Sequence, residues 1–112
     1  MHEMIKNISK AEVVTLREQV ACQPGQVVSR TLAQNDAVSI TLFAFDKGEE
    51  ISTHDSDGDA LVLVLSGRGR FTVDGKVHSL EPGECVVMPA QKPHALYAED
   101  AFQMLLVVVF PE

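Results

Sequence analysis

The 112-residue sequence has no tryptophan, one tyrosine and only two cysteines, and it lacks any long apolar run. No stretch approaches the roughly 20 consecutive apolar residues that a membrane-spanning helix needs. The first residues also lack the basic region and apolar core that are typical of a secretory signal. These absences argue against a membrane or secreted protein. We therefore expect a cytoplasmic protein in which Cys22 and Cys85 are reduced thiols.

Positive charge is also scarce. Nine Lys and Arg residues stand against sixteen Asp and Glu residues, which gives a formal net charge of −7. Such a chain repels a phosphate backbone and an anionic lipid surface. We therefore expect neither nucleic acid nor a membrane as a partner.

Apolar residues are plentiful, at 46% of the chain, and no stretch is rich in Ser, Gly or Pro. This composition is typical of a folded protein, and the length is close to the commonest domain size. We expect one domain over residues 1–112, which has room for one hydrophobic core.

Strand signals dominate from Val27 onward, as short runs rich in Val, Leu, Ile, Phe and Thr between turn residues. The expected strands are residues 27–33, 38–45, 68–73, 76–80, 85–88 and 102–110. Asp74-Gly75 joins two of them and predicts a type I′ turn, which needs positive φ at both positions. The sequence therefore predicts an all-β fold with a barrel over about residues 27–110.

The N-terminal segment, about residues 1–20, differs from the rest. Ser9 and Glu12 have the spacing of a helix capping box, but the β-branched residues Val13, Val14 and Thr15 follow directly. We expect this segment to be irregular, with at most a short helical turn.

Two apolar runs, residues 60–65 and 104–110, do not alternate with polar residues. Both faces of these strands would be apolar, whereas an antiparallel sheet usually keeps one face polar. Because burying one Leu or Val stabilises a protein by about 1.5–3 kcal/mol, several of them would not remain exposed. The N-terminal segment or a second subunit must cover them, and we predict a homodimer.

Two segments resemble the paired motifs of the cupin family. Residues 48–67 carry the glycines and the first histidine of one motif as Gly48, His54 and Gly67. Residues 83–94 carry the glycine, proline and histidine of the other as Gly83, Pro89 and His94. This resemblance implies a double-stranded β-helix, also called a jelly-roll barrel, with a small-molecule ligand in its lumen.

The metal-binding residues of the family are only half present. In metal-binding cupins, two histidines and a glutamate of the first motif join the histidine of the second to hold one divalent ion. His54 and His94 match, but Ser56 and Ala60 stand where the other histidine and the glutamate belong. Gln91 replaces a glycine of the second motif.

A third ligand is needed, because two imidazoles make a weak site. On a regular strand, Ala60 shares the inward face with His54, and Asp59 points out. A bulge or turn at Gly58 would reverse this and aim Asp59 inward. The sequence then predicts a site of His54, His94 and Asp59 for iron, manganese, zinc or nickel.

Three functions remain open. The first is a binding module whose ligand-binding residues are His54, Ser56, Gln91, His94 and Tyr97. The second is a metal-dependent enzyme of the dioxygenase or isomerase type that uses His54 and His94. The third is a metal-free enzyme in which the same two histidines exchange protons with the substrate. The fold does not choose among them, since this barrel hosts many chemistries.

Overall fold

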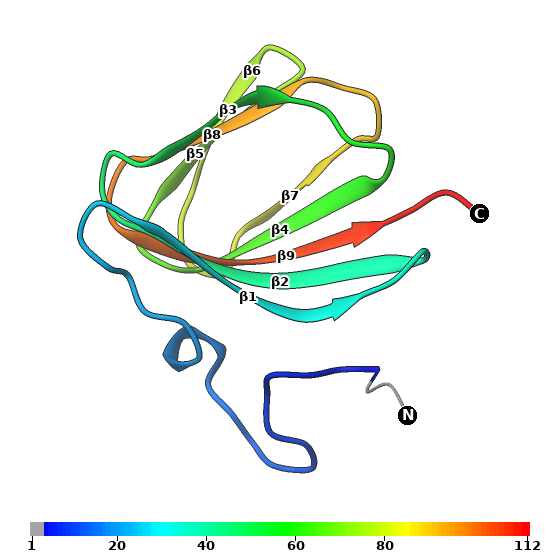
Figure 1. Cartoon of the computed structure of the whole chain (residues 1–112). Coiled ribbons are helices and arrows are strands. Elements are labelled where there is room, and N and C mark those ends of the chain that lie inside the picture. The colour runs from blue at the N-terminus through cyan, green and yellow to red at the C-terminus, as the bar shows by residue number, and fades with distance from the viewer. Residues whose placement is uncertain (1–3) are drawn as a thin grey trace.

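The computed structural model describes residues 4–112, and these form a β-barrel preceded by an irregular segment (Figure 1). The strands of this part of the chain are β1 (Val27–Gln34), β2 (Val38–Phe45), β3 (Glu50–His54), β4 (Asp59–Ser66), β5 (Gly69–Val73), β6 (Lys76–Leu80), β7 (Cys85–Met88), β8 (His94–Ala98) and β9 (Phe102–Val109). The all-β prediction is confirmed. No helix within the described residues is long and apolar enough to cross a bilayer.

The strands form two antiparallel sheets that face each other (Figure 1). The large sheet has the order β1-β2-β9-β4-β7, and the small sheet has the order β3-β8-β5-β6. This is the predicted jelly-roll barrel. The turn between β5 and β6 has φ of 48° at Asp74 and 83° at Gly75, as a type I′ turn requires.

Three phenylalanines from both sheets pack one end of the barrel. Phe45 and Phe102 are paired on β2 and β9, and their rings stack with centroids 4.7 Å apart. Phe71 of the small sheet meets Phe102 edge-on at 6.0 Å. All three side chains are fully buried, so the two sheets are held together firmly at this end.

The N-terminal segment covers part of the outer face of the large sheet. Its Val20 is buried against Leu42 and Ala44, which point outward from β2. Gln103 of β9 fixes the segment, because its side-chain amide donates to the backbone carbonyls of Arg17, at 2.7 Å, and Val20. The outward-facing apolar side chains of Leu42, Ala44 and Leu105 are thus explained by the segment that lies over them.

The only helical turn within residues 4–112 is the 3-10 helix η1 (Leu16–Glu18). The expectation of an irregular segment with at most a short helical turn is confirmed, although the turn lies at Leu16–Glu18 and not at the Ser9-Glu12 spacing. Ala11 has φ of 61°, which lies outside the right-handed helical region and interrupts any helix there.

The outer face of β4 and β7 has no such cover within the described residues. Leu61, Val87 and Val109 are exposed by 37%, 49% and 58%, and Cys85 is exposed beside them. These side chains point outward from neighbouring strands. The apolar runs of the sequence are therefore covered only in part by the N-terminal segment.

Candidate functional site

His54 and His94 meet at the end of the barrel opposite the phenylalanines. His54 ends β3, His94 begins β8, and the two residues are paired across these strands. Their Nε2 atoms lie 3.0 Å apart, and the rings meet edge-on with centroids 4.2 Å apart. His94 is buried and His54 is exposed, so the pair reaches from the interior to the surface.

Backbone carbonyls fix the tautomer of both rings. His54 Nδ1 lies 3.0 Å from the carbonyl oxygen of Ser52, and His94 Nδ1 lies 3.2 Å from that of Lys92. A carbonyl oxygen only accepts hydrogen bonds, so each Nδ1 carries the proton and donates it. In the neutral state both Nε2 atoms then present lone pairs to each other, and a hydrogen bond between them requires one doubly protonated ring.

The surroundings of His94 disfavour such a proton on its own ring. Burial lowers the pKa of His94, and the neighbouring His54 lowers it further. The carbonyl of Lys92 and the carboxylate of Asp55 act in the opposite direction with smaller effects. His94 is therefore neutral at physiological pH, with its Nε2 available as an acceptor.

Two loops beside the histidines are tied to each other. The hydroxyl of Ser56 donates to the carbonyl of Gly58 at 2.8 Å, and the carbonyl of Ser56 accepts from Gln91 N–H at 2.9 Å. The side-chain amide of Gln91 donates to Asp57 at 3.2 Å. Gln91 has φ of 66°, the left-handed conformation that the glycine of the family motif adopts without strain. Ser56 and Gln91 thus hold the loops together rather than pointing directly at the histidine pair.

Asp59 does not join the histidines. The regular strand does break at residues 55–58, as proposed from Gly58, but Ala60 is still the buried residue, on the inner face of β4. Asp59 is exposed, and its carboxylate accepts the backbone N–H of Ala90 at 2.8 Å. Within residues 4–112, no group of three His, Cys, Asp or Glu side chains is arranged to hold a metal ion.

The Nε2 atoms of His54 and His94 could fill two ligand positions of a metal site, and no described side chain fills a third. Two nitrogen atoms 3.0 Å apart are compatible with one ion about 2.1 Å from each. The Nδ1 contacts to carbonyls are also the orienting bonds that metal-binding histidines usually make. Ser56 and Ala60 supply no further strong ligand, so the described residues do not complete a usual three-ligand site.

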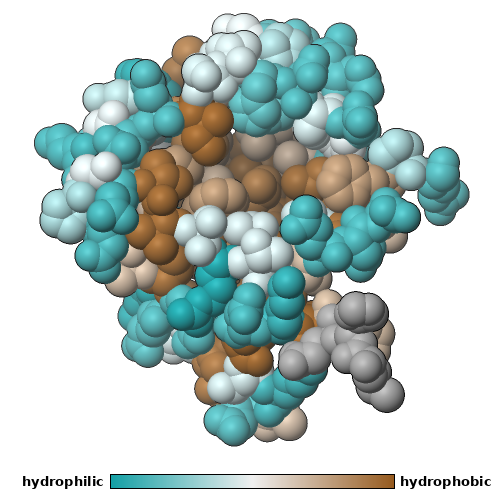
Figure 2. Space-filling model, viewed as in Figure 1, coloured by the Kyte–Doolittle hydropathy of each residue, from teal (hydrophilic) through white to brown (hydrophobic). Residues whose placement is uncertain are grey.

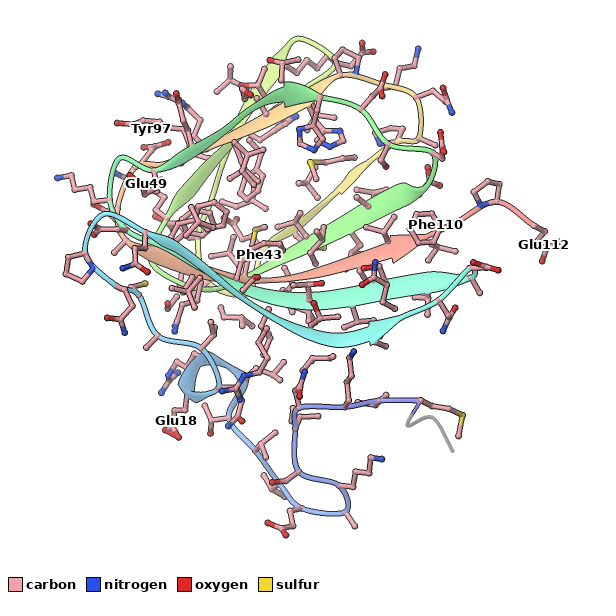
Figure 3. All side chains as sticks on the ribbon, viewed as in Figure 1. Glu18, Phe43, Glu49, Tyr97, Phe110 and Glu112 are labelled. Carbon is pink, nitrogen blue, oxygen red and sulfur yellow. The ribbon has the colours of Figure 1, made fainter. Side chains whose placement is uncertain are left out.

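Tyr97 lies outside the barrel. It is three residues after His94 on β8, so its side chain points to the opposite face of the small sheet (Figure 3). There its ring contacts the guanidinium of Arg70, which lies 4.7 Å from the ring centroid. The structure therefore does not bring Tyr97 to the histidine pair.

The space between the sheets opens to the surface on one face of the molecule. Figure 2 shows that this face of the molecule is hollowed and that apolar side chains surround the hollow. Several apolar side chains that pack on the core are only half-buried: Phe43, Ile51, Val86, Leu106 and Val108. Phe43 points from β2 into the space between the sheets (Figure 3).

Hydroxyl groups line one wall of the hollow, which the sequence reasoning missed. On β2, Ser39 and Thr41 share the inner face with Phe43, while Ile40 and Leu42 point outward. A half-buried strand usually turns its apolar residues to the core and its polar residues outward. On this part of β2 the polar residues face inward, and the apolar residues face outward under the N-terminal segment. The alternation of Ser and Thr with Ile and Leu was the available signal.

Comparison with known proteins agrees with this architecture. The family model described as Cupin domain matches residues 41–110. The structure of a conserved protein of unknown function from Streptococcus pyogenes is 49% identical, with a TM-score of 0.96 over 99% of this chain and 97% of that one. A cupin superfamily protein from Desulfitobacterium hafniense is 34% identical, with a TM-score of 0.91 over 96% of this chain and 98% of that one.

One curated enzyme also matches. A 5-nitrosalicylic acid 1,2-dioxygenase from a Bradyrhizobium species is 32% identical over 62 residues. The match covers 55% of this chain and only 30% of that enzyme.

Proposed function

Because the chain belongs to the cupin family, we propose that it binds a small molecule in the hollow between its two sheets, anchored by His54 and His94. One observation carries this proposal: the two Nε2 atoms lie 3.0 Å apart, and no other described residue forms a hydrogen bond with either of them. A ligand hydroxyl or amine would donate a hydrogen bond to either nitrogen that carries a lone pair. The half-buried apolar side chains around the hollow would contact the rest of the molecule.

Binding of small aromatic probes tests this function. We choose salicylate, phenol and benzoate, because the dioxygenase relative is named for a salicylic acid and because these probes separate the hydroxyl from the carboxylate. Isothermal titration with the wild-type protein should detect salicylate and phenol. His54→Ala should weaken both by about tenfold, the effect of one lost hydrogen bond of about 1.4 kcal/mol.

The matched control is His78→Ala, which removes an exposed imidazole on β6, away from the pair. This variant should bind the probes as the wild type does. Equal losses in both variants, or no binding of any probe by the wild type, would contradict the proposal.

A metal-dependent enzyme of the dioxygenase or isomerase type is the second candidate. The dioxygenase relative favours it, as do the fixed Nδ1 protons that leave both Nε2 atoms free for an ion. Iron, manganese, zinc or nickel held by two imidazoles would take its remaining ligands from substrate and water. Elemental analysis of protein purified without an affinity tag, before and after incubation with each metal, tests this candidate. Only a small fraction of one equivalent in every case would rule it out.

A homodimer through the outer face of β4, β7 and β9 accompanies either function. The exposed Leu61, Val87 and Val109 support it, since a contiguous apolar patch on a surface usually marks an interface. The patch lies on the outside of the large sheet, so pairing would leave the hollow accessible.

A further inference from the structure

Thr41 has a hydroxyl group that faces the hollow and lacks a protein partner. The residue is 8% exposed, on the inner face of β2 between Thr31 of β1 and Leu106 of β9. No side chain or backbone group of residues 4–112 forms a hydrogen bond with its hydroxyl. Every fully enclosed polar side-chain atom in this part of the chain does have a partner. The Thr41 oxygen is therefore not fully enclosed, and the space that it reaches is the hollow.

The neighbours of Thr41 make a small polar wall. Thr31 is directly opposite on β1, and Ser39 is on the same face of β2; both are half-buried. None of these three residues carries a charge, and no described residue forms a hydrogen bond with any of their three hydroxyl groups. Beyond them the inner face of the large sheet is apolar, with Leu106 and Val108 on β9. The hydroxyl groups therefore lie on the large sheet, and the two histidines lie on the small sheet opposite.

A hydroxyl in this position does not help the protein to fold. It forms no hydrogen bond with a described residue, and valine would fill the same space with the same β-branched shape. The other mostly buried polar side chain of the large sheet, Gln103, is fully used by Ser66 and by two backbone carbonyls. The contrast indicates that the partner of Thr41 comes from outside the protein.

We propose that Thr41 is a second ligand-binding residue, and that the ligand is a small hydroxy acid. Its hydroxyl group would donate to the histidine Nε2 atoms, and its carboxylate would accept from Thr41 and the neighbouring hydroxyls of Thr31 and Ser39. The apolar body would lie against Phe43 and the other half-buried side chains. This inference rests on the proposed binding function and adds the class of ligand.

The probes separate the two anchors. Salicylate carries a hydroxyl and a carboxylate, phenol only the hydroxyl, and benzoate only the carboxylate. Thr41→Val should weaken salicylate and benzoate by about tenfold and leave phenol unchanged, whereas His54→Ala weakens salicylate and phenol. Thr72→Val, which makes the same change on the outer face of β5, should change none of the three.

The stability of the unliganded protein gives a second measurement. Thr41→Val and Thr72→Val should both leave the Tm within about 2 °C of the wild type, because neither hydroxyl forms a hydrogen bond with a described residue. If Thr41→Val binds all three probes as the wild type does while His54→Ala loses phenol, the binding function stands and the role of Thr41 is refuted. If Thr41→Val lowers the Tm, the hydroxyl has a structural role and the inference fails. If the wild type binds no probe, both proposals fail.

Discussion

The Nε2 atoms of His54 and His94 lie 3.0 Å apart although the residues are 40 positions apart in the chain. The two rings nevertheless have different surroundings, since His94 is 4% exposed and His54 is an exposed residue. The same substitution should therefore affect stability differently at the two positions.

His94→Ala should destabilise the protein by roughly 1–3 kcal/mol, because it leaves a cavity among buried residues. His54→Ala should change the free energy of unfolding by less than about 0.5 kcal/mol, as is typical of exposed positions. Urea denaturation of both variants measures the difference. Equal destabilisation by the two changes would show that His54 is packed as tightly as His94.

Stability should fall as the pH drops below 6.5. That is the ordinary pKa of histidine, and burial together with His54 lowers the pKa of His94 in the folded protein. Between the two values the unfolded chain binds the proton more readily than the folded chain, so acid favours unfolding. The contribution is fully present above pH 6.5 and is lost as the pH falls toward the lowered pKa of the folded state.

His94→Asn removes this titrating group. Its free energy of unfolding should therefore decrease less than that of the wild type between about pH 8 and about pH 5.5. Parallel pH profiles for the two proteins would mean that His94 does not contribute to the acid sensitivity.

Gly58→Ala should be strongly destabilising. A Cβ atom on Gly58 would lie 2.5 Å from the carbonyl oxygen of Val109, so the backbone of β9 or of the loop must move. We expect a loss of about 1–3 kcal/mol, measured by urea denaturation. Gly25→Ala is the control, because its φ of 68° is unfavourable but nothing lies within 4 Å of the added atom. A smaller effect at Gly58 than at Gly25 would contradict the close approach.

The sequence predicted the barrel and the meeting of the two histidines, because turn residues and motif spacings are local features that it contains directly. The Asp74-Gly75 turn is the clearest case. Tyr97 was assigned to the lumen against its own strand periodicity, since a residue three positions from His94 points to the opposite face. The outward position of Tyr97 therefore follows from the strand periodicity.

Other features depended on tertiary contacts that no local pattern reveals. Asp59 is held by the backbone N–H of Ala90, which comes from a loop 31 residues away. Thr41 alternates with Ile40 and Leu42, but the alternation does not say which face is inner; Thr41 faces the core between the sheets, and the N-terminal segment covers the opposite face. Neither assignment follows from periodicity alone.

Gln103→Leu should release the N-terminal segment. The change removes the donor for the carbonyls of Arg17 and Val20 and leaves them without their partner, at a cost of about 1–3 kcal/mol. Trypsin should then cleave after the exposed Arg17 faster than in the wild type, as followed by mass spectrometry. Ser66→Ala removes only the hydroxyl that donates to Gln103 and should have a smaller effect. Equal cleavage rates in wild type and Gln103→Leu would contradict the anchoring role.

Val87→Lys should produce a monomer if the outer face of β7 is the dimer interface. Val87 is exposed by 49%, so a lysine fits the single chain without strain but would be buried in the dimer. Light scattering coupled to size-exclusion chromatography gives the mass of both proteins. The control Val77→Lys alters an exposed position on β6 of the small sheet and should leave the mass unchanged. A wild-type protein that is monomeric at micromolar concentration would refute the dimer.

The anchoring of the N-terminal segment also limits how the barrel can be engineered. A shortened version that begins at β1 would expose Leu42 and Ala44 to water and would leave the amide of Gln103 without its backbone acceptors. Such a fragment should aggregate. A barrel transplanted into another protein must keep residues 4–26 with it, or the apolar side chains on the outer face of β2 must be replaced by polar ones.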